Sequence, residues 1–330
     1  MSDENMDAAV EAFKERDDFL ITVHVNPEGD SVGSQLAVYH MLRKLGKRAV
    51  MVNHDEVPDN LTFLPGNDLI MRETPPDFNV DTVVVLDCPV KERTGRIKGI
   101  LDKAKFIVNI DHHVSNEYFG DVNWVEPEAS SVGEMLFFAA RKLGLEIDHD
   151  LAAAIYTAIV TDTGMFNYNN TSRRTHEVAG ELIEEGVNPK AMHSEIFEKK
   201  KLSEIRMLGR VLATLQIEED GAVAHMSLTD KMYKAEGIDF VSTEQFINYP
   251  RSIAGVEVAI FFRESHDGSG KINVSFRSGE KVDVDTLAAR FGGGGHKRAS
   301  GCLVEGRLPE VMDKVLAEVS KALKKAGKGK

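Results

Sequence analysis

The chain has 330 residues, of which 42% are hydrophobic and 28% charged, and its formal net charge is −13. This length accommodates two domains, and the two cysteines, Cys88 and Cys302, are too few for a disulfide framework. The sequence shows no apolar signal core near its N-terminus and no run of about 18 apolar residues, which argues against a membrane span and predicts a soluble cytoplasmic protein.

The net negative charge comes entirely from the first two thirds of the chain. Residues 1–215 hold 23 Lys and Arg against 36 Asp and Glu, whereas residues 216–330 hold 17 of each. Because binding to long nucleic acid rests on neutralising many phosphates, this acidity argues against long duplex partners. A short phosphorylated molecule needs few local cations and remains compatible with the charge.

Apolar strands alternate with helical patterns along the first half of the chain. Strands are expected over 19–25, 49–52, 82–86 and 106–110. Helices are expected over 31–45, 131–143, 150–160 and 174–185. This alternation is typical of a mostly parallel sheet with helices on both faces, and such α/β sheets bind ligands beyond the carboxyl ends of their strands.

The pattern changes in the last third of the chain. Short alternating segments at 222–226, 256–262 and 271–276 predict the strands of a smaller α+β domain. We therefore expect a first domain over 1–187, a helical linker over 188–215 and a second domain over 216–330. The Lys-rich segment 321–330 is expected to be a frayed end.

Acidic and imidazole side chains follow the apolar segments of the first domain. The set comprises His24, Glu28, Asp30, Asp87, Asp111, His112, His113 and Asp162. Carboxylates and imidazoles suit Mn²⁺ or Mg²⁺, and so many of them at strand ends predict a two-metal hydrolytic centre. Cys88, beside Asp87, is a weaker candidate ligand, because a lone cysteine in such a place is more often a small buried residue.

A glycine-rich loop in the second domain is a second candidate site, for binding an anion. It comprises Gly292, Gly293, Gly294 and Gly295, followed by His296, Lys297 and Arg298. Successive glycine N–H groups can surround an anion, and Arg277 is expected on a nearby strand. The combination favours a clamp for a phosphate over a plain turn.

These motifs together resemble the DHH phosphoesterase superfamily. The resemblance rests on His24-x-x-Pro-Glu-x-Asp-x-x-Gly-Ser, on the strand ending in Asp87, on Asp111-His112-His113 and on Thr161-Asp162-Thr163-Gly164. The segment 291–301 is similar to the signature of the DHH-associated C-terminal domain. Residues 111–116 and 274–278 are similar to the subgroup of nucleases that degrade very short RNA and dephosphorylate 3′-phosphoadenosine 5′-phosphate (pAp).

The resemblance implies a set of roles for the site residues. One divalent ion would be held by His24, Glu28 and Asp87, and a second by Asp30, Asp87, His112 and Asp162, with Mn²⁺ favoured over Mg²⁺. His113 would face the substrate phosphate and Asp111 would orient a histidine. Arg277, His296, Arg298, Ser115, Asn116 and the four glycines would contact the substrate. Glu28 departs from the family pattern, which usually has Asp there.

The implied activity is two-metal hydrolysis of RNA oligomers of about 2–5 nucleotides to nucleoside 5′-monophosphates, and of pAp to AMP. The second domain would hold the part of the substrate that does not react. A phosphodiesterase acting on cyclic or linear dinucleotides is the main alternative, and a pyrophosphatase or a single-strand DNA exonuclease is disfavoured. A non-catalytic nucleotide sensor, suggested by Glu28, and a homodimer both remain open.

Overall fold

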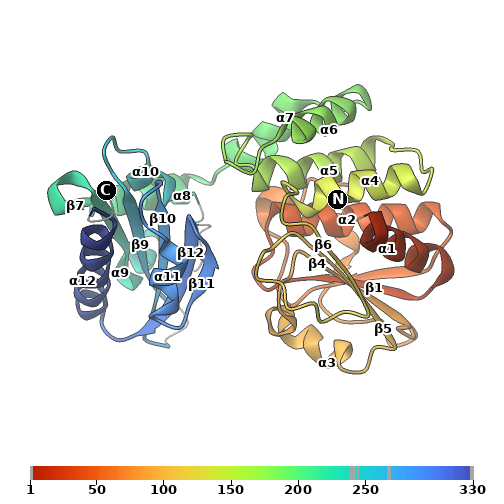
Figure 1. Ribbon diagram of the computed structural model, residues 1–330, viewed down its shortest axis with the longest axis horizontal. Helices are drawn as coiled ribbons and strands as arrows, with labels where there is room; N and C mark the ends of the chain where they lie inside the picture. Colours follow the sequence, from red (N-terminus) through yellow and green to blue (C-terminus); the bar gives the residue numbers. More distant parts are fainter. Residues whose placement is uncertain (1–2, 238–242, 244, 266–268, 328–330) are drawn as a thin grey trace. The chain divides into compact units, whose positions relative to one another are not determined.

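The computed structural model describes residues 3–237, 243, 245–265 and 269–327. The chain divides into two compact units, Met1–Lys199 and Lys200–Lys330, which are described separately (Figure 1). Within the described ranges, no helix is both long and apolar enough to cross a membrane.

The first unit is built on a parallel sheet of six strands. These are β1 (Phe19–Val23), β2 (Ala49–Val52), β3 (Ile70–Met71), β4 (Thr82–Leu86), β5 (Phe106–Asp111) and β6 (Val122–Val125). Their order is β3-β2-β1-β4-β5-β6, and each neighbouring pair is parallel. β1 and β4 are buried along their whole length, as expected of uninterrupted apolar strands covered on both faces. The predicted α/β fold is confirmed.

The strand order changes direction between β1 and β4. From β1 the chain adds β2 and β3 on one side, then returns to place β4 on the other. The two connections that leave β1 and β4 diverge there, and open α/β sheets bind ligands beyond the carboxyl ends of the strands at such a point. His24 and Asp87 follow these two strands directly.

Helices cover the two faces of this sheet unequally (Figure 1). The thicker layer contains α1 (Asp3–Glu15), α2 (Gly29–Lys44), α4 (Val132–Lys142), α5 (His149–Asp162) and α6 (Arg173–Glu184), and its core includes Phe13, Leu36, Trp124 and Ile155. The opposite face carries η3 (Lys91–Ile97) and α3 (Lys98–Leu101). Short 3₁₀ turns, η1 (Asp59–Leu61) and η2 (Asn67–Leu69), lie between β2 and β3.

Small residues let α2, α4 and α5 approach closely. A Cβ atom on Gly33 would lie 2.5 Å from the Ala154 carbonyl oxygen, and one on Gly133 would lie 2.3 Å from the Ala158 Cβ. This contact places the first turn of α2 beside the N-terminus of α4. The side chain of Asp30 therefore reaches backbone N–H groups of α4.

The second unit contains a mixed sheet of six strands. These are β7 (Gln216–Glu218), β8 (Val223–Leu228), β9 (Val258–Glu264), β10 (Lys271–Ser278), β11 (Gly294–His296) and β12 (Ala299–Glu305). Their order is β11-β12-β10-β9-β8-β7, with β8 and β9 parallel and the other pairs antiparallel. β10 alternates between half-buried and buried residues, as a strand with one core-facing side should.

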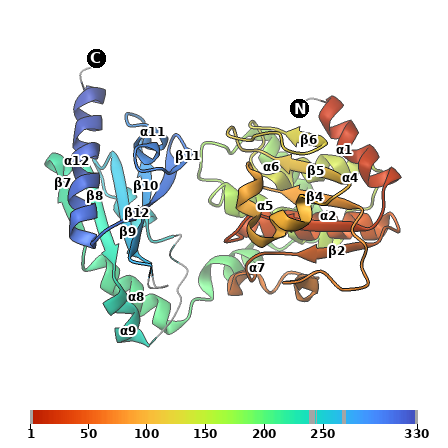
Figure 2. The same ribbon diagram turned by 90° about the horizontal axis from the view of Figure 1, so that it is seen from below.

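Helices also lie on both faces of the second sheet. Figure 2 shows α12 (Leu308–Gly327) running along it, and α11 (Val284–Ala289) shares the same core. The other face is covered by α8 (Leu202–Leu212), α9 (Asp230–Glu236) and the region of α10 (Asn248–Arg251), with the turn η5 (Glu219–Gly221) before β8.

Two segments differ from the expected organisation. Residues 321–327 are not frayed as predicted, because they continue helix α12, which ends at Gly327; residues 328–330 lie outside the described ranges. Residues 188–215 are shared between the units. α7 (Pro189–His193) and the π-helical turn Ser194–Glu198 pack on the first unit, and α8 packs in the core of the second.

Candidate metal centre

His24 and Asp87 meet at the point where the strand order reverses. His24 Nδ1 donates to the carbonyl oxygen of Val25 at 2.7 Å, which leaves Nε2 as the nitrogen for a ligand. His24 Nε2 lies 3.3 Å from Asp87 Oδ2, and both side chains are buried. Burial lowers the pKa of His24, so the ring is neutral and able to coordinate a metal.

Asp87 is a buried carboxylate that lies beside the rings of His24, His112 and His113. Neither oxygen accepts a hydrogen bond from a described residue, and its backbone is left-handed, with φ 53°. His112 Nε2 and His113 Nδ1 lie 3.7 Å and 3.5 Å from Oδ1. Burial, together with the charge of Asp30, raises the pKa of Asp87 to about 7. A buried carboxylate without donors is costly unless a cation compensates it.

His112 stands between three carboxylates. Its Nδ1 faces the Ala129 carbonyl oxygen at 3.2 Å. Its Nε2 lies 3.6 Å from Asp162 Oδ2 and 3.7 Å from Asp30 Oδ2. Although burial opposes the charged ring, the surrounding carboxylates raise the pKa of His112 to about 10. A divalent cation would take over this neutralising role and hold the ring neutral.

Asp30 is held by the N-terminus of α4. Its Oδ2 accepts from Val132 N at 2.8 Å and its Oδ1 from Gly133 N at 3.1 Å. Ser34 Oγ donates to Oδ1 at 2.9 Å. Burial nevertheless outweighs these bonds and raises the pKa of Asp30. The N-terminus of α4 therefore fixes the position of the Asp30 carboxylate, but a cation is still needed to offset the cost of burying its charge.

Asp162 and Glu28 complete the ring of carboxylates. Asp162 ends α5, and its Oδ2 accepts from Asn170 Nδ2 at 3.2 Å. Burial, with His112 opposing and Asp30 adding to it, raises the pKa of Asp162 to about 7. Glu28 directly precedes α2, and burial together with Asp87 and Asp162 raises its pKa to about 8.

The geometry fits metal binding. Ligand atoms lie within 4.8 Å of one another in three groups: His24, Glu28 and Asp87; Asp30, His112 and Asp162; and Asp87, His112 and His113. All six residues predicted as ligands are therefore brought together. The third group is less suited to a separate ion, because His113 Nδ1 already faces Asp111 Oδ1 at 2.7 Å. Oxygen and imidazole donors without thiolates suit a hard or borderline divalent ion.

The two substrate contacts predicted in the loop after β5, Ser115 and Asn116, have different surroundings. Ser115 is exposed, as a substrate contact would be. Asn116 is buried, and its amide group bonds to Asn109, Asp111 and the backbone of Tyr118. Burial of this kind argues against the predicted substrate contact at Asn116 and for a role within the protein.

In the second unit, Arg277 and His296 lie on the two strands that flank β12. Arg277 on β10 and His296 on the edge strand β11 both lie opposite Ala299 of β12, so they share one row of the sheet. His296 is exposed and Arg277 is half-buried, with its Nη1 donating to the carbonyl oxygen of Phe276 at 3.0 Å.

The glycine loop departs from the predicted anion cradle. Gly292 N and Gly293 N donate to carbonyl oxygens at the end of α11, those of Ala289 and Ala288. A Cβ atom on Gly293 would lie 2.1 Å from the Gly301 carbonyl oxygen, so close packing requires this glycine. Gly294 and Gly295 lie in β11 and pair with β12. These contacts argue against a four-glycine nest.

Arg298 is also committed internally. Its guanidinium donates to the carbonyl oxygens of Val282 and Glu280. This arrangement ties the loop before α11 to the turn between β11 and β12, and it argues against the predicted substrate contact at Arg298.

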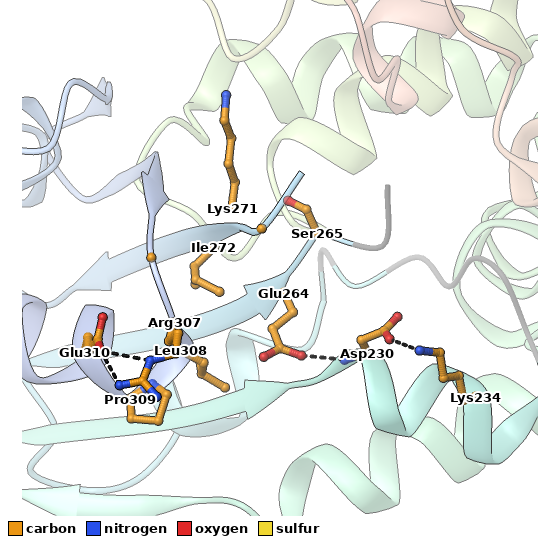
Figure 3. A pocket seen from close by; sticks show the side chains of 12 residues that line it. Asp230, Lys234, Glu264, Ser265, Lys271, Ile272, Arg307, Leu308, Pro309 and Glu310 are labelled. Carbon is orange, nitrogen blue, oxygen red and sulfur yellow. Dashed lines mark hydrogen bonds and ion pairs between the residues drawn. The ribbon is translucent and has the colours of Figure 1, made fainter. Parts of the chain in front are cut away.

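A separate hollow of about 870 Å³ lies in the second unit (Figure 3). It is lined by the ends of β9 and β10 and by the start of α12, at the opposite end of β10 from Arg277. Its charged groups are largely paired with one another: Glu264 accepts from Asp230 N, Asp230 pairs with Lys234, and Arg307 pairs with Glu310. It is therefore not the predicted clamp.

Sequence reasoning missed the asparagines that support the centre. Asn109 lies within β5, and Asn170 donates from one amide to Asp162 and to the Ser130 carbonyl oxygen. The signal for Asn109 was a single amide inside the apolar run 106–110. Asn170 lies in a polar loop and carries no such signal.

Comparison with known proteins assigns the class. The model of the DHH family N-terminal domain matches residues 18–159, and that of the DHHA1 domain matches residues 220–325. The chain belongs to the DHH family of phosphoesterases, with a DHHA1 domain in its second unit.

Individual relatives are similar over nearly the whole chain. A protein of Thermus thermophilus named bifunctional oligoribonuclease and PAP phosphatase NrnA is 32% identical, over 93% of this chain and 90% of the relative. Its namesake in Bacillus subtilis is 29% identical, over 92% and 94%. The crystal structure of an exopolyphosphatase-related protein from Bacteroides fragilis matches with a TM-score of 0.88 at 29% identity, covering 98% of this chain and 96% of that one.

Proposed function

We propose that the protein is a metal-dependent hydrolase that degrades RNA oligomers of a few nucleotides to nucleoside 5′-monophosphates and converts pAp to AMP. The observation that carries the proposal is the ring of buried and half-buried carboxylates and imidazoles around Asp87, whose own oxygens accept no hydrogen bond from described residues. The names of the relatives from Thermus thermophilus and Bacillus subtilis supply the substrate class.

The proposed ligands divide into two sets that share Asp87. His24, Glu28 and Asp87 would hold one ion, and Asp30, Asp87, His112 and Asp162 the other. Two divalent ions, most suitably Mn²⁺, would supply Lewis-acid stabilisation of phosphoryl charge and a nucleophile at neutral pH. The carboxylates with raised pKa would lose their protons when the ions bind.

The protein's own groups would do the remaining work at the phosphate. His113 Nδ1 is occupied by Asp111, so His113 would reach the phosphate through Nε2. There it would steady the phosphoryl charge or protonate the leaving oxygen. Arg277 and His296 are proposed to contact the part of the substrate that does not react.

A product time course with Mn²⁺ tests the proposal. The substrates are pAp, a diribonucleotide, an RNA of about 24 nucleotides and cyclic di-AMP, each with an EDTA control. We expect AMP from pAp and mononucleotides from the diribonucleotide, with the long RNA much slower. Fastest turnover of cyclic di-AMP would favour the dinucleotide phosphodiesterase. A lack of turnover on all four, with tight nucleotide binding, would favour the sensor.

A further inference from the structure

Two asparagine side chains form a buried bridge between Asp87 and His113. Asn109 lies inside β5, and Asn116 lies in the loop that follows it; they are 0% and 7% exposed. An amide inside an apolar parallel strand is costly unless each of its polar atoms has a partner. The partners of these two amides therefore indicate what the amides do.

Asn109 fastens the backbone on both sides of Asp87. Its Nδ2 donates to the carbonyl oxygens of Val85 and Cys88, at 3.3 Å and 3.2 Å. Asp87 lies between them in the left-handed region, which a non-glycine residue occupies only when its surroundings hold it there. Asn109 is one of the groups that hold it.

Asn116 continues the bridge to His113. Its Nδ2 donates to Asn109 Oδ1 at 2.8 Å and to Asp111 Oδ2 at 2.6 Å. The other oxygen of Asp111 faces His113 Nδ1 at 2.7 Å. Asn116 Oδ1 accepts from the backbone N–H of Tyr118 at 2.7 Å. All four amide hydrogens of the pair are used, which fixes both amide orientations.

We propose that Asn109 and Asn116 are positioning residues that set the imidazole of His113 relative to the carboxylate of Asp87. Asn116 acts through Asp111, and Asn109 acts through the backbone around Asp87. Only the expected effect of these residues on kcat rests on the proposed function; the positioning itself does not. It replaces the substrate contact that the sequence predicts for Asn116.

Steady-state kinetics of Asn116→Ala on pAp provide the first test. Because outer groups that orient active-site residues typically contribute 10- to 100-fold, we expect kcat to fall by about that factor. KM should change by less than about twofold, since substrate binding is not touched. Asn123→Ala is the matched control: it loses two hydrogen bonds to Gly120, at 2.9 Å and 2.6 Å, without any bond to Asp111, and should behave as wild type.

A double-mutant cycle separates positioning from a direct contact. In a His113→Ala background, Asn116→Ala should lower kcat by less than about twofold, because the group it positions is gone. An undiminished effect in that background, or a large rise in KM, would overturn the proposal in favour of a substrate contact.

NMR of the metal-free protein gives a readout that needs neither metal nor substrate. The ring N–H proton of His113, assigned by its loss in His113→Ala, should also be lost to exchange in Asn116→Ala and retained in Asn123→Ala. An unchanged signal in Asn116→Ala overturns the proposal, even if the protein hydrolyses neither pAp nor short RNA. Asn116→Ser serves for the same comparison if circular dichroism shows that Asn116→Ala does not fold.

Discussion

Single residues of the centre carry charges that the fold leaves uncompensated. Asp87 and Asp162 have pKa values raised to about 7, and Glu28 to about 8, because burial and mutual repulsion disfavour their charged forms. A fold selected for stability alone would replace such a cluster with apolar residues. The cluster therefore indicates a function that needs cations.

The stability of the metal-free protein should fall as the pH rises from about 6.5 to 8.5. Raised carboxylate pKa values mean that the folded state keeps protons which the unfolded state has lost. Their contribution is complete below about pH 4 and is lost progressively up to about pH 8, and the pKa of His112, raised to about 10, extends the decline from about pH 6.5 upward. The pKa values of His24 and His225 are lowered from the ordinary 6.5, so these two residues change the stability only below about pH 6.5, outside this window.

Thermal unfolding in EDTA and in saturating Mn²⁺ checks this pH dependence. The decline of Tm should be clear in EDTA, shallower in Asp87→Asn, and weak with Mn²⁺. A metal-free Tm that rises over the same range would show that these carboxylates are already ionised and compensated.

The Glu28→Asp variant tests whether the longer side chain of Glu28 is suited to binding the proposed metal ion. Glu28 lies within one ligand group with His24 and Asp87, which supports the proposal that the site accommodates its longer side chain. We expect turnover at saturating Mn²⁺ to be nearly unchanged and the half-saturating Mn²⁺ concentration to shift by about tenfold or less. A turnover that rises more than about tenfold would instead mean that the native site is crippled.

At the scale of elements, the close contact of α2 with α5 delivers Asp30 to the centre. In Gly33→Ala the new Cβ would lie 2.5 Å from the Ala154 carbonyl oxygen, so the helices must separate. Overpacking of this kind costs about 1–3 kcal/mol of unfolding free energy. Mn²⁺ affinity should fall as well, because α2 carries Asp30.

The matched control for this prediction is Gly180→Ala in α6, where nothing lies within 4 Å of the added Cβ. Alanine is the better helix former by about 1 kcal/mol, so this variant should be equal or more stable in urea. Equal destabilisation by both substitutions would mean that the helix contact is not the cause.

Elements with a strong local signal could be predicted from the sequence. β2 and β4 match their predicted ranges because each is an uninterrupted apolar run. β6 and β11 are among the strands that were not predicted: Asn123 interrupts the apolar residues of β6, and β11 is Gly-Gly-His, which has no strand signal of its own and is defined by its pairing with β12. The proposed metal ligands could be predicted because these acidic and imidazole residues follow apolar segments, whereas the asparagine bridge exists only once β4 and β5 pair.

At the scale of the whole molecule, the proposed function places the chemistry in the first unit and the binding of the unreacting part of the substrate in the second. Arg277→Ala should lower kcat/KM for pAp and dinucleotides by roughly ten- to a hundredfold, the value of a charge-assisted bond of about 1.5–3 kcal/mol. It should spare bis-p-nitrophenyl phosphate, which lacks the part of the substrate that Arg277 would bind.

Arg263→Ala is the control for Arg277. Arg263 lies on the neighbouring strand β9, opposite Asn273, and its Nη1 donates to Thr243 Oγ1 at 3.0 Å. This variant should leave both substrate types unaffected. Equal losses on both substrates in Arg277→Ala would place Arg277 at the metal centre or in the support of the fold.

The most direct test of the proposed two-metal centre is the number of metal ions that the Asp87→Ala variant binds. Isothermal titration with Mn²⁺, with metal analysis of the same samples, should find two ions per chain in the wild type. The variant should bind at most one, weakly, and should lose hydrolysis of pAp while its circular dichroism spectrum is retained. A variant that still holds two ions, or turns over at a near-normal rate, would contradict a centre in which both metals depend on Asp87.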